Sequence, residues 1–172
     1  QIEALYELEK SRKEGAEKGI VHAATGIGKT YLAAFDSLPY KRVLFVAHRE
    51  EILRQAAEAF HNVRPDDSYG FFTGDKKDAD VDLLFASVAS LGKEEVLKGK
   101  FSPDSFEYIV MDECHHSTAD QYQKILDFFH PAYLLGLTAT PERMDGRSVY
   151  ELYDFEVPYE ITLKEAVNRG VL

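Results

Sequence analysis

Short, continuous runs of apolar residues recur along the chain and alternate with longer segments of mixed polarity. The runs are rich in β-branched and aromatic side chains, and few polar residues interrupt them. Strands that are buried on both faces have this pattern, so the runs predict the strands of a parallel sheet. The predicted strands are Ile20–Ala23, Val43–Ala47, Leu83–Ala86, Tyr108–Met111 and Tyr133–Leu137.

Apolar residues at helical spacing lie between these runs and at both ends of the chain. The first such stripe is expected to end near Gly15 or Gly19, and the last at Gly170. Segment Gly74–Asp82 is interpreted as a solvated loop because charged residues dominate it. Since strands and helices alternate, the sequence predicts an α/β fold with right-handed crossovers. The helical stripes are Ile2, Leu5 and Leu8; Ile52, Leu53, Ala56, Ala57 and Phe60; Tyr122, Ile125, Leu126 and Phe129; and Leu163, Ala166 and Val167.

The composition is that of a globular protein rather than a disordered one, since 45% of the 172 residues are apolar. No apolar run approaches the roughly 20 residues of a membrane-spanning helix, so no membrane partner is expected. Cys114 is the one cysteine and cannot form a disulfide within the chain, which favours a cytoplasmic location. The formal net charge of −10 disfavours nucleic-acid binding over the whole surface but is compatible with a local basic groove.

A glycine-rich segment, ATGIGKT, follows the first predicted strand and precedes a helical segment. Such a turn exposes successive backbone N–H groups to an anion, and the start of the helix adds its positive end. Lys29 can reach the β- and γ-phosphates of a nucleotide, and the Thr30 hydroxyl can hold Mg²⁺. A structural turn with a surface lysine is the plainer alternative, but the strand–loop–helix context favours phosphate binding. The predicted phosphate-binding residues are Thr25, Gly26, Ile27, Gly28, Lys29 and Thr30.

Two adjacent carboxylates, Asp112 and Glu113, end the fourth apolar run. Ligands of open α/β sheets bind beyond the carboxyl ends of the strands. Asp112 is therefore predicted to hold Mg²⁺, directly or through water, and Glu113 to orient the water that attacks the γ-phosphate.

The next three residues, Cys114, His115 and His116, raise the alternative of a zinc or thiol site. Three adjacent side chains do not converge easily on one tetrahedral metal, and no C-x-x-C accompanies them. A catalytic cysteine would also need a histidine positioned from elsewhere in the chain. A buried cysteine beside histidines that form ordinary hydrogen bonds is the favoured interpretation.

Three segments, AATGIGKT, DECHH and LTATPER, occur in this order, and each follows an apolar run. Together they resemble the motifs of the first RecA-like domain of a superfamily-two DEAD/DEAH-box-like helicase. Within that superfamily they are most similar to the group of the type III restriction enzyme Res subunit. The A-x-x-G-x-G-K-T form usual there accounts for Ala23, which stands where the strict phosphate-loop pattern has glycine. The resemblance implies a RecA-like P-loop NTPase fold, a three-layer sandwich with a mostly parallel central sheet, which uses ATP and Mg²⁺.

The same resemblance gives roles to residues outside the phosphate loop. Gln1 resembles the glutamine that contacts adenine in these proteins. His115 falls on the histidine of the family's D-E-x-H pattern, which would couple the acidic pair to the T-A-T segment. Thr138 and Thr140 of that segment would link the ATP state to closure of the domains.

Four further residues resemble positions that contact the nucleic-acid backbone. These are Arg49 in FVAHREEIL, Thr73 and Gly74 in FFTGD, and Ser87 in FASVASL. Plainer alternatives stay open, because Arg49 can be a solvated residue at the start of a helix and Ser87 can cap one.

The resemblance covers nearly the whole chain, so residues 1–172 are interpreted as one helicase ATP-binding domain from a longer chain. That longer chain is expected to carry a second RecA-like domain, whose arginine fingers contribute rate factors of about 10³–10⁵ in related NTPases. Residues 1–172 alone are therefore expected to hydrolyse ATP poorly.

The predicted function is an ATP-dependent helicase or translocase of nucleic acid, with DNA favoured over RNA. One alternative is a module that translocates or remodels duplex without separating its strands. A P-loop kinase or small-molecule ATPase is another, and the DECHH and TATP segments argue against it.

Overall fold

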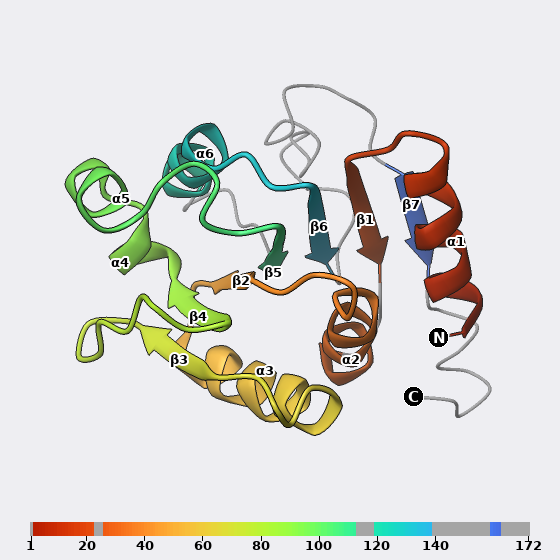
Figure 1. The fold of residues 1–172 in the computed structure, drawn as a ribbon, viewed down its shortest axis with the longest axis horizontal. Helices are drawn as coiled ribbons and strands as arrows, with labels where there is room; N and C mark the ends of the chain where they lie inside the picture. Colours follow the sequence, from red (N-terminus) through yellow and green to blue (C-terminus); the bar gives the residue numbers. More distant parts are fainter. Residues whose placement is uncertain (1, 23–25, 113–118, 139–158, 163–172) are drawn as a thin grey trace.

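The computed structural model describes residues 2–22, 26–112, 119–138 and 159–162. Helices and strands alternate along most of the described chain, as the sequence predicts (Figure 1). The elements are α1 (Ile2–Lys13), β1 (Lys18–His22), α2 (Gly26–Asp36), β2 (Val43–Ala47), α3 (Glu50–Val63), β3 (Tyr69–Phe72), β4 (Leu83–Ser87), α4 (Val88–Leu91), α5 (Glu94–Lys100), β5 (Tyr108–Asp112), α6 (Ala119–Phe128), β6 (Tyr133–Thr138) and β7 (Tyr159–Thr162). The alternation is interrupted where β4 follows β3 and α5 follows α4 directly.

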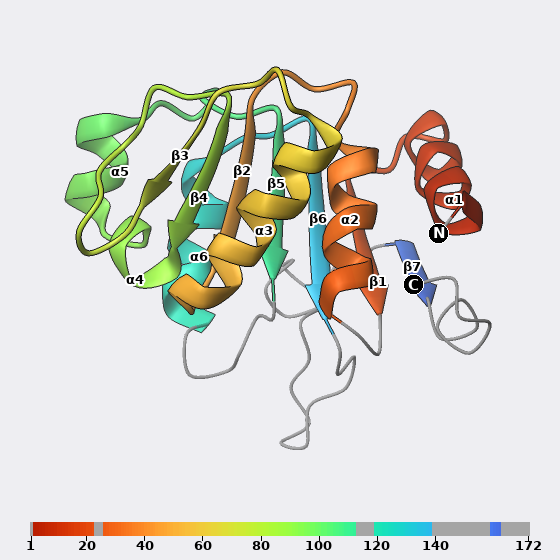
Figure 2. The ribbon, with the colours of Figure 1, turned by 90° about the horizontal axis from the view of Figure 1, so that it is seen from below.

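The strands form one sheet in the order β3-β4-β2-β5-β6-β1-β7. Every pairing between these strands is parallel, so all their carboxyl ends lie along the same edge (Figure 2). Strand β6 pairs with β1 on one side and with β5 on the other. The ends of β1 and β5 are therefore separated by the width of a single strand.

Helices cover both faces of the sheet and make a three-layer sandwich, with α2 and α3 on one face and α5 and α6 on the other (Figure 1). Phe45 and Phe85 point toward α3, where Phe60 packs on them with ring centroids 5.8 and 5.5 Å away. Their neighbours Leu44 and Val46 belong to the cluster on the opposite face. Because both faces are buried, each central strand is apolar at successive positions, which explains the continuous runs in the sequence.

The strands predicted from the sequence are confirmed, with ends that differ by at most two residues. Two further strands, β3 and β7, and the short helix α5 were not predicted, whereas α4 is the helix that one interpretation of Ser87 expected. Strand β3 lies at the edge of the sheet, has four residues and exposes Tyr69, so its sequence carries no continuous apolar run. The helix predicted near residues 163–170 lies outside the described part of the chain.

The loop between β3 and β4 is more ordered than a solvated turn. Lys77 forms an antiparallel bridge with Phe72, and the Asp78 carboxylate accepts a hydrogen bond of 3.1 Å from the backbone N–H of Phe71. Most of its charged side chains are exposed, as expected, but Asp78 fixes the loop against β3.

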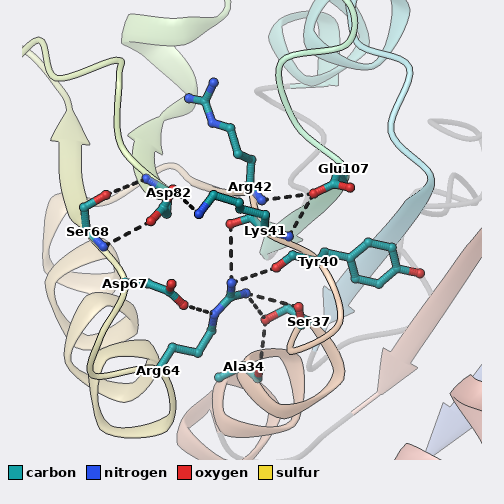
Figure 3. A network of polar contacts seen from close by, with 10 residues as sticks. All are labelled: Ala34, Ser37, Tyr40, Lys41, Arg42, Arg64, Asp67, Ser68, Asp82 and Glu107. Atoms are coloured by element: carbon teal, nitrogen blue, oxygen red, sulfur yellow. Dashed lines mark hydrogen bonds and ion pairs between the residues drawn. The ribbon is translucent and has the colours of Figure 1, made fainter.

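A buried arginine connects the end of α3 to the segment that leads from α2 into β2 (Figure 3). Arg64 is 6% exposed and donates to the carbonyl oxygens of Ser37 and Tyr40 at 3.1 and 2.7 Å. Its Nε donates to the Asp67 carboxylate at 2.6 Å. These bonds fix the end of α3 against the segment that follows α2.

Helix α1 ends at a glycine in the left-handed conformation. Gly15 has a φ of 100°, and the N–H of Ala16 donates to the carbonyl of Ser11 at 2.9 Å. The N–H of Gly15 donates to the carbonyl of Arg12 at 3.0 Å, which completes a Schellman motif. The predicted end of the first helix near Gly15 is therefore confirmed.

We expect Gly15→Ala to lower the free energy of unfolding by about 1 kcal/mol, because an L-residue adopts a positive φ at that cost. An added Cβ at Gly15 meets no atom within 4 Å, so the effect isolates the backbone. Urea unfolding followed by circular dichroism measures it.

Gly99 in α5 is the matched control. A Cβ there also meets no atom within 4 Å, and its backbone is helical. Gly99→Ala should be neutral or stabilise by up to about 1 kcal/mol. Equal effects at the two glycines would contradict the assignment of the cap.

Candidate nucleotide site

The phosphate loop and the acidic residue that the sequence singles out lie at the same edge of the sheet. Helix α2 begins at Gly26, just beyond the carboxyl end of β1. Asp112 is the last residue of β5, and only β6 separates β5 from β1. The parallel sheet thus places the two segments together although they are more than 80 residues apart in the sequence.

Lys29 and Asp112 form an ion pair, with the ammonium nitrogen 3.2 Å from Oδ1 of the carboxylate. Each side chain is only 4% exposed. Burial weakens solvent screening, so this pair interacts more strongly than a surface pair at the same distance. The ion pair confirms that the phosphate loop and the end of β5 face each other.

The end of β5 is also held from the opposite face of the sheet. The Tyr122 hydroxyl of α6 donates a buried hydrogen bond of 2.9 Å to the backbone carbonyl of Asp112. This bond fixes the backbone from which the Asp112 carboxylate projects.

The start of α2 provides a favourable environment for an anion. Its first turn contains no acidic residue, and the positive end of the helix dipole lies there. Lys29 and Thr30 follow in this turn with 3% and 7% of their surfaces exposed. The turn can therefore offer backbone N–H groups, an ammonium and a hydroxyl to one ligand.

Oxygen donors suited to magnesium are present at the same place. The Thr30 hydroxyl and the Asp112 carboxylate are hard ligands of the kind that Mg²⁺ prefers. Among the described residues, no group of three or more His, Cys, Asp or Glu could hold a metal ion. A magnesium ion here would need phosphate oxygens as well, which is how Mg²⁺ usually binds in nucleotide enzymes.

Several predicted site residues lie outside the described part of the chain. The positions of Thr138, Gly26 and Ile27 are known only through the secondary structure to which they belong. Their proposed roles remain predictions. The undescribed residues are Gln1, Thr25, Glu113, His115 and Thr140, together with Cys114 and His116 of the alternative metal site.

The four residues predicted to contact nucleic acid follow adjacent strands at the same edge. Arg49 lies exposed before α3, and Thr73 and Gly74 follow β3. Ser87 ends β4, where its hydroxyl accepts a hydrogen bond of 3.2 Å from the N–H of Ser90. Ser87 therefore caps α4, as the plainer interpretation held, and any contact of Ser87 with nucleic acid remains a prediction.

A pocket of about 220 Å³ lies beside these residues and was not predicted. It lies between the first turns of α3 and the loop after β3. The Lys76 ammonium is 5.1 Å from the centre of the Phe71 ring. Glu50 and Arg54 are four residues apart and therefore share one face of α3. The sequence alone did not show that the loop after β3 would pack against this face. The pocket is lined by Glu50, Arg54, Phe71, Thr73, Asp75 and Lys76.

A larger pocket, of about 360 Å³, lies at the opposite edge of the sheet. Lys18 begins β1 and His130 follows α6, so this pocket is at the amino ends of the strands. It lies at the opposite end of the strands from Lys29 and Asp112. Its lining includes Glu17, Lys18, Gln123, Asp127 and His130.

Among the described residues, no helix has both the length and the apolar character that a membrane-spanning segment requires.

Comparison with known proteins agrees with the motifs. The model of the family described as "Type III restriction enzyme, res subunit" matches residues 1–143. The chain belongs to this family. The Res-subunit family assignment confirms the resemblance drawn from AATGIGKT, DECHH and LTATPER.

Two curated relatives show how the Res-subunit chain compares with longer proteins. The type I restriction enzyme EcoAI endonuclease subunit of Escherichia coli is 30% identical over 190 residues, which cover 100% of this chain and 22% of that protein. The DNA 3'-5' translocase XPB2 of Sulfurisphaera tokodaii is 29% identical over 138 residues, which cover 80% of this chain and 30% of that protein. The chain therefore spans less than a third of either relative.

A solved structure supports the fold. The crystal structure of a hypothetical ATP-dependent RNA helicase from Sulfolobus tokodaii superimposes with a TM-score of 0.71 and 24% sequence identity. The match covers 87% of this chain and 48% of that one. The predicted RecA-like α/β architecture is thus confirmed.

Proposed function

We propose that the chain is the first RecA-like domain of a nucleic-acid-dependent ATPase, which couples ATP hydrolysis to movement along a strand. The observation that carries the proposal is the buried ion pair between Lys29 of the phosphate loop and Asp112 at the end of β5. P-loop NTPases use a lysine and an acidic residue in these positions to hold the phosphates and the metal. Membership of the Res-subunit family supports the same assignment.

Each residue of the site has a proposed role. The backbone N–H groups of residues 25–30 and the Lys29 ammonium hold the phosphates of ATP. The Thr30 hydroxyl and the Asp112 carboxylate would hold Mg²⁺, which neutralises charge that develops on the phosphate oxygens. Glu113 orients the attacking water, and Gln1 contacts the adenine.

The coupling of hydrolysis to movement is proposed to need a second RecA-like domain in the full-length protein. His115, Thr138 and Thr140 would transmit the state of the nucleotide to that domain. The relatives that exceed this chain several-fold in length leave ample sequence for it.

The nucleic acid is proposed to lie along the carboxyl ends of β2, β3 and β4. Arg49, Thr73, Gly74 and Ser87 follow these strands and would contact phosphate and sugar groups. Such contacts fix position without reading the sequence, so binding should be independent of sequence and should weaken as salt increases. We favour DNA over RNA because the family and the two curated relatives carry restriction-enzyme or DNA-translocase names.

The test is the steady-state ATPase rate of the full-length protein with single-stranded DNA, duplex DNA and RNA in turn. We expect stimulation by nucleic acid, and more by DNA than by RNA. An ATPase rate that no nucleic acid changes would contradict the proposal and favour a small-molecule ATPase.

The family name also favours a second candidate, a translocase that moves along duplex without opening it. Strand-displacement and triplex-displacement assays on the same preparation separate the two. Displacement of a triplex-forming strand without separation of the duplex would support the translocase.

A further inference from the structure

The Lys29–Asp112 ion pair has a consequence for the order in which ligands bind. We propose that Lys29 keeps the Asp112 carboxylate from binding a divalent cation until a nucleotide has drawn the ammonium away. This inference rests on the proposed function and adds an obligatory order to it. Free metal does not occupy the site first; it enters with the nucleotide or after it.

The first step of the argument is that Asp112 is already neutralised by a cation. The Lys29 nitrogen lies 3.2 Å from Oδ1, and both side chains are 4% exposed. A divalent ion bound to this carboxylate would stand next to the ammonium in a poorly solvated place. Like charges at such short range repel strongly where water does not screen them.

The second step is that the described chain offers a free metal little in exchange. Among the residues that the structure describes, no group of three or more His, Cys, Asp or Glu could hold a metal ion. Mg²⁺ also loses its bound waters reluctantly. From the described residues, a lone divalent ion would therefore gain few protein ligands in exchange for displacing Lys29.

The third step is that a polyphosphate can move Lys29. The lysine side chain is a flexible four-carbon stem with three rotatable donors, so its ammonium can turn from one oxygen to another. The start of α2, where Lys29 lies, attracts anions. Once the ammonium contacts phosphate oxygens, the Asp112 carboxylate becomes available, and the phosphates supply the missing ligands.

Mn²⁺ binding to the nucleotide-free protein tests the inference, with electron paramagnetic resonance reporting the bound ion. We expect weak binding to the wild type and at least about tenfold tighter binding to Lys29→Met, which removes the charge but keeps much of the length. Lys29→Arg keeps the cation and should bind Mn²⁺ as weakly as the wild type.

Two controls identify the site. Lys41 is 77% exposed and 3.9 Å from the Asp82 carboxylate, so Lys41→Met removes a lysine of a surface pair and should not change Mn²⁺ affinity. The double variant Lys29→Met/Asp112→Asn should lose the gain, because the new binding depends on the Asp112 carboxylate. Equal Mn²⁺ affinities of the wild type and Lys29→Met would overturn the inference.

A second measurement needs no variant and decides the matter if Lys29→Met fails to fold. The ¹³C resonance of the Asp112 carboxyl group should not move when Mg²⁺ alone is added to the wild type, and it should move when ADP is added with Mg²⁺. A shift with Mg²⁺ alone would overturn the inference. These metal titrations contain no ATP, so the inference about binding order can be wrong while ATP binding persists. If the proposed function were wrong, ATP binding itself would be absent.

Discussion

Lys29→Ala is expected to weaken MgATP binding by about 100-fold or more and to abolish measurable ATP hydrolysis. The substitution removes the ammonium that we propose to contact the triphosphate, in a place where the Lys29 side chain is 4% exposed. Truncation of one charged partner in a buried binding contact costs about 3 kcal/mol or more, which corresponds to a factor of about 100 or more in affinity. Isothermal titration calorimetry and a steady-state ATPase assay, both on the full-length protein, measure the two effects.

Lys41→Ala is the matched control for Lys29→Ala. Lys41 is exposed and its pair with Asp82 belongs to the class of surface ion pairs that contribute about 0–1 kcal/mol. ATP binding should be unchanged in this variant. Because Lys29 is buried, circular dichroism must first show that Lys29→Ala is folded. A folded Lys29→Ala protein with intact ATPase activity would refute the assignment of the phosphate loop.

The second large effect is expected on stability, from Asp36→Ala. Asp36 ends α2, and its side chain is 2% exposed. Both carboxylate oxygens accept hydrogen bonds of 2.7 Å from the Arg12 guanidinium, and Oδ2 also accepts one of 2.6 Å from the Tyr108 hydroxyl. Asp36 thereby connects α1, α2 and the start of β5.

Removal of Asp36 leaves the buried Tyr108 hydroxyl without its acceptor and the Arg12 guanidinium paired with the exposed Glu9. The Arg12 side chain is 13% exposed, and its guanidinium lies 4.7 Å from the centre of the Tyr133 ring. The guanidinium therefore cannot reach solvent by a simple rotation of the side chain. Burial, and then the Asp36 charge, raise the pKa of Tyr108 well above its usual value, so the hydroxyl remains a donor. We expect the free energy of unfolding to fall by about 3–5 kcal/mol, measured by urea denaturation.

Glu9→Ala provides the comparison, because Glu9 pairs with the same guanidinium at 2.9 Å but is 50% exposed. An exposed pair three residues apart on a helix should contribute less than about 1 kcal/mol. If the two substitutions destabilised the protein equally, the structural role given to Asp36 would be wrong.

The sequence predicted the central strands well because burial on both faces leaves a local signature. Val43–Ala47 was predicted to the residue, since the five positions of β2 are all buried. Strands β3 and β7 lie at the two edges of the sheet and have four residues each. Pairing with the neighbouring strand, rather than a pattern in their own sequences, therefore determines that these segments form strands. The polar connections were also beyond prediction, because Arg12 and Asp36 are 24 residues apart and meet only in the folded chain.

For the candidate site as well, one part could be predicted from the sequence and another part could not. The proximity of Lys29 and Asp112 followed from two general rules: the phosphate loop follows the first strand, and parallel strands end at one edge. Their direct ion pair did not follow, because it depends on how the two side chains are oriented and buried. The cap formed by Ser87 was one of two open interpretations; the hydrogen bond from the N–H of Ser90 confirms the cap, and contact of Ser87 with nucleic acid stays a prediction.

The central claim is that a nucleotide binds at the start of α2 against the end of β5. Titration of the ¹⁵N-labelled protein with Mg²⁺ and a non-hydrolysable ATP analogue, followed by NMR of the backbone amides, tests it most directly. We predict that the largest chemical-shift changes fall on Gly28, Lys29, Thr30 and Asp112. Unchanged resonances at these residues, with the changes confined to the pocket around Lys18 and His130, would contradict it.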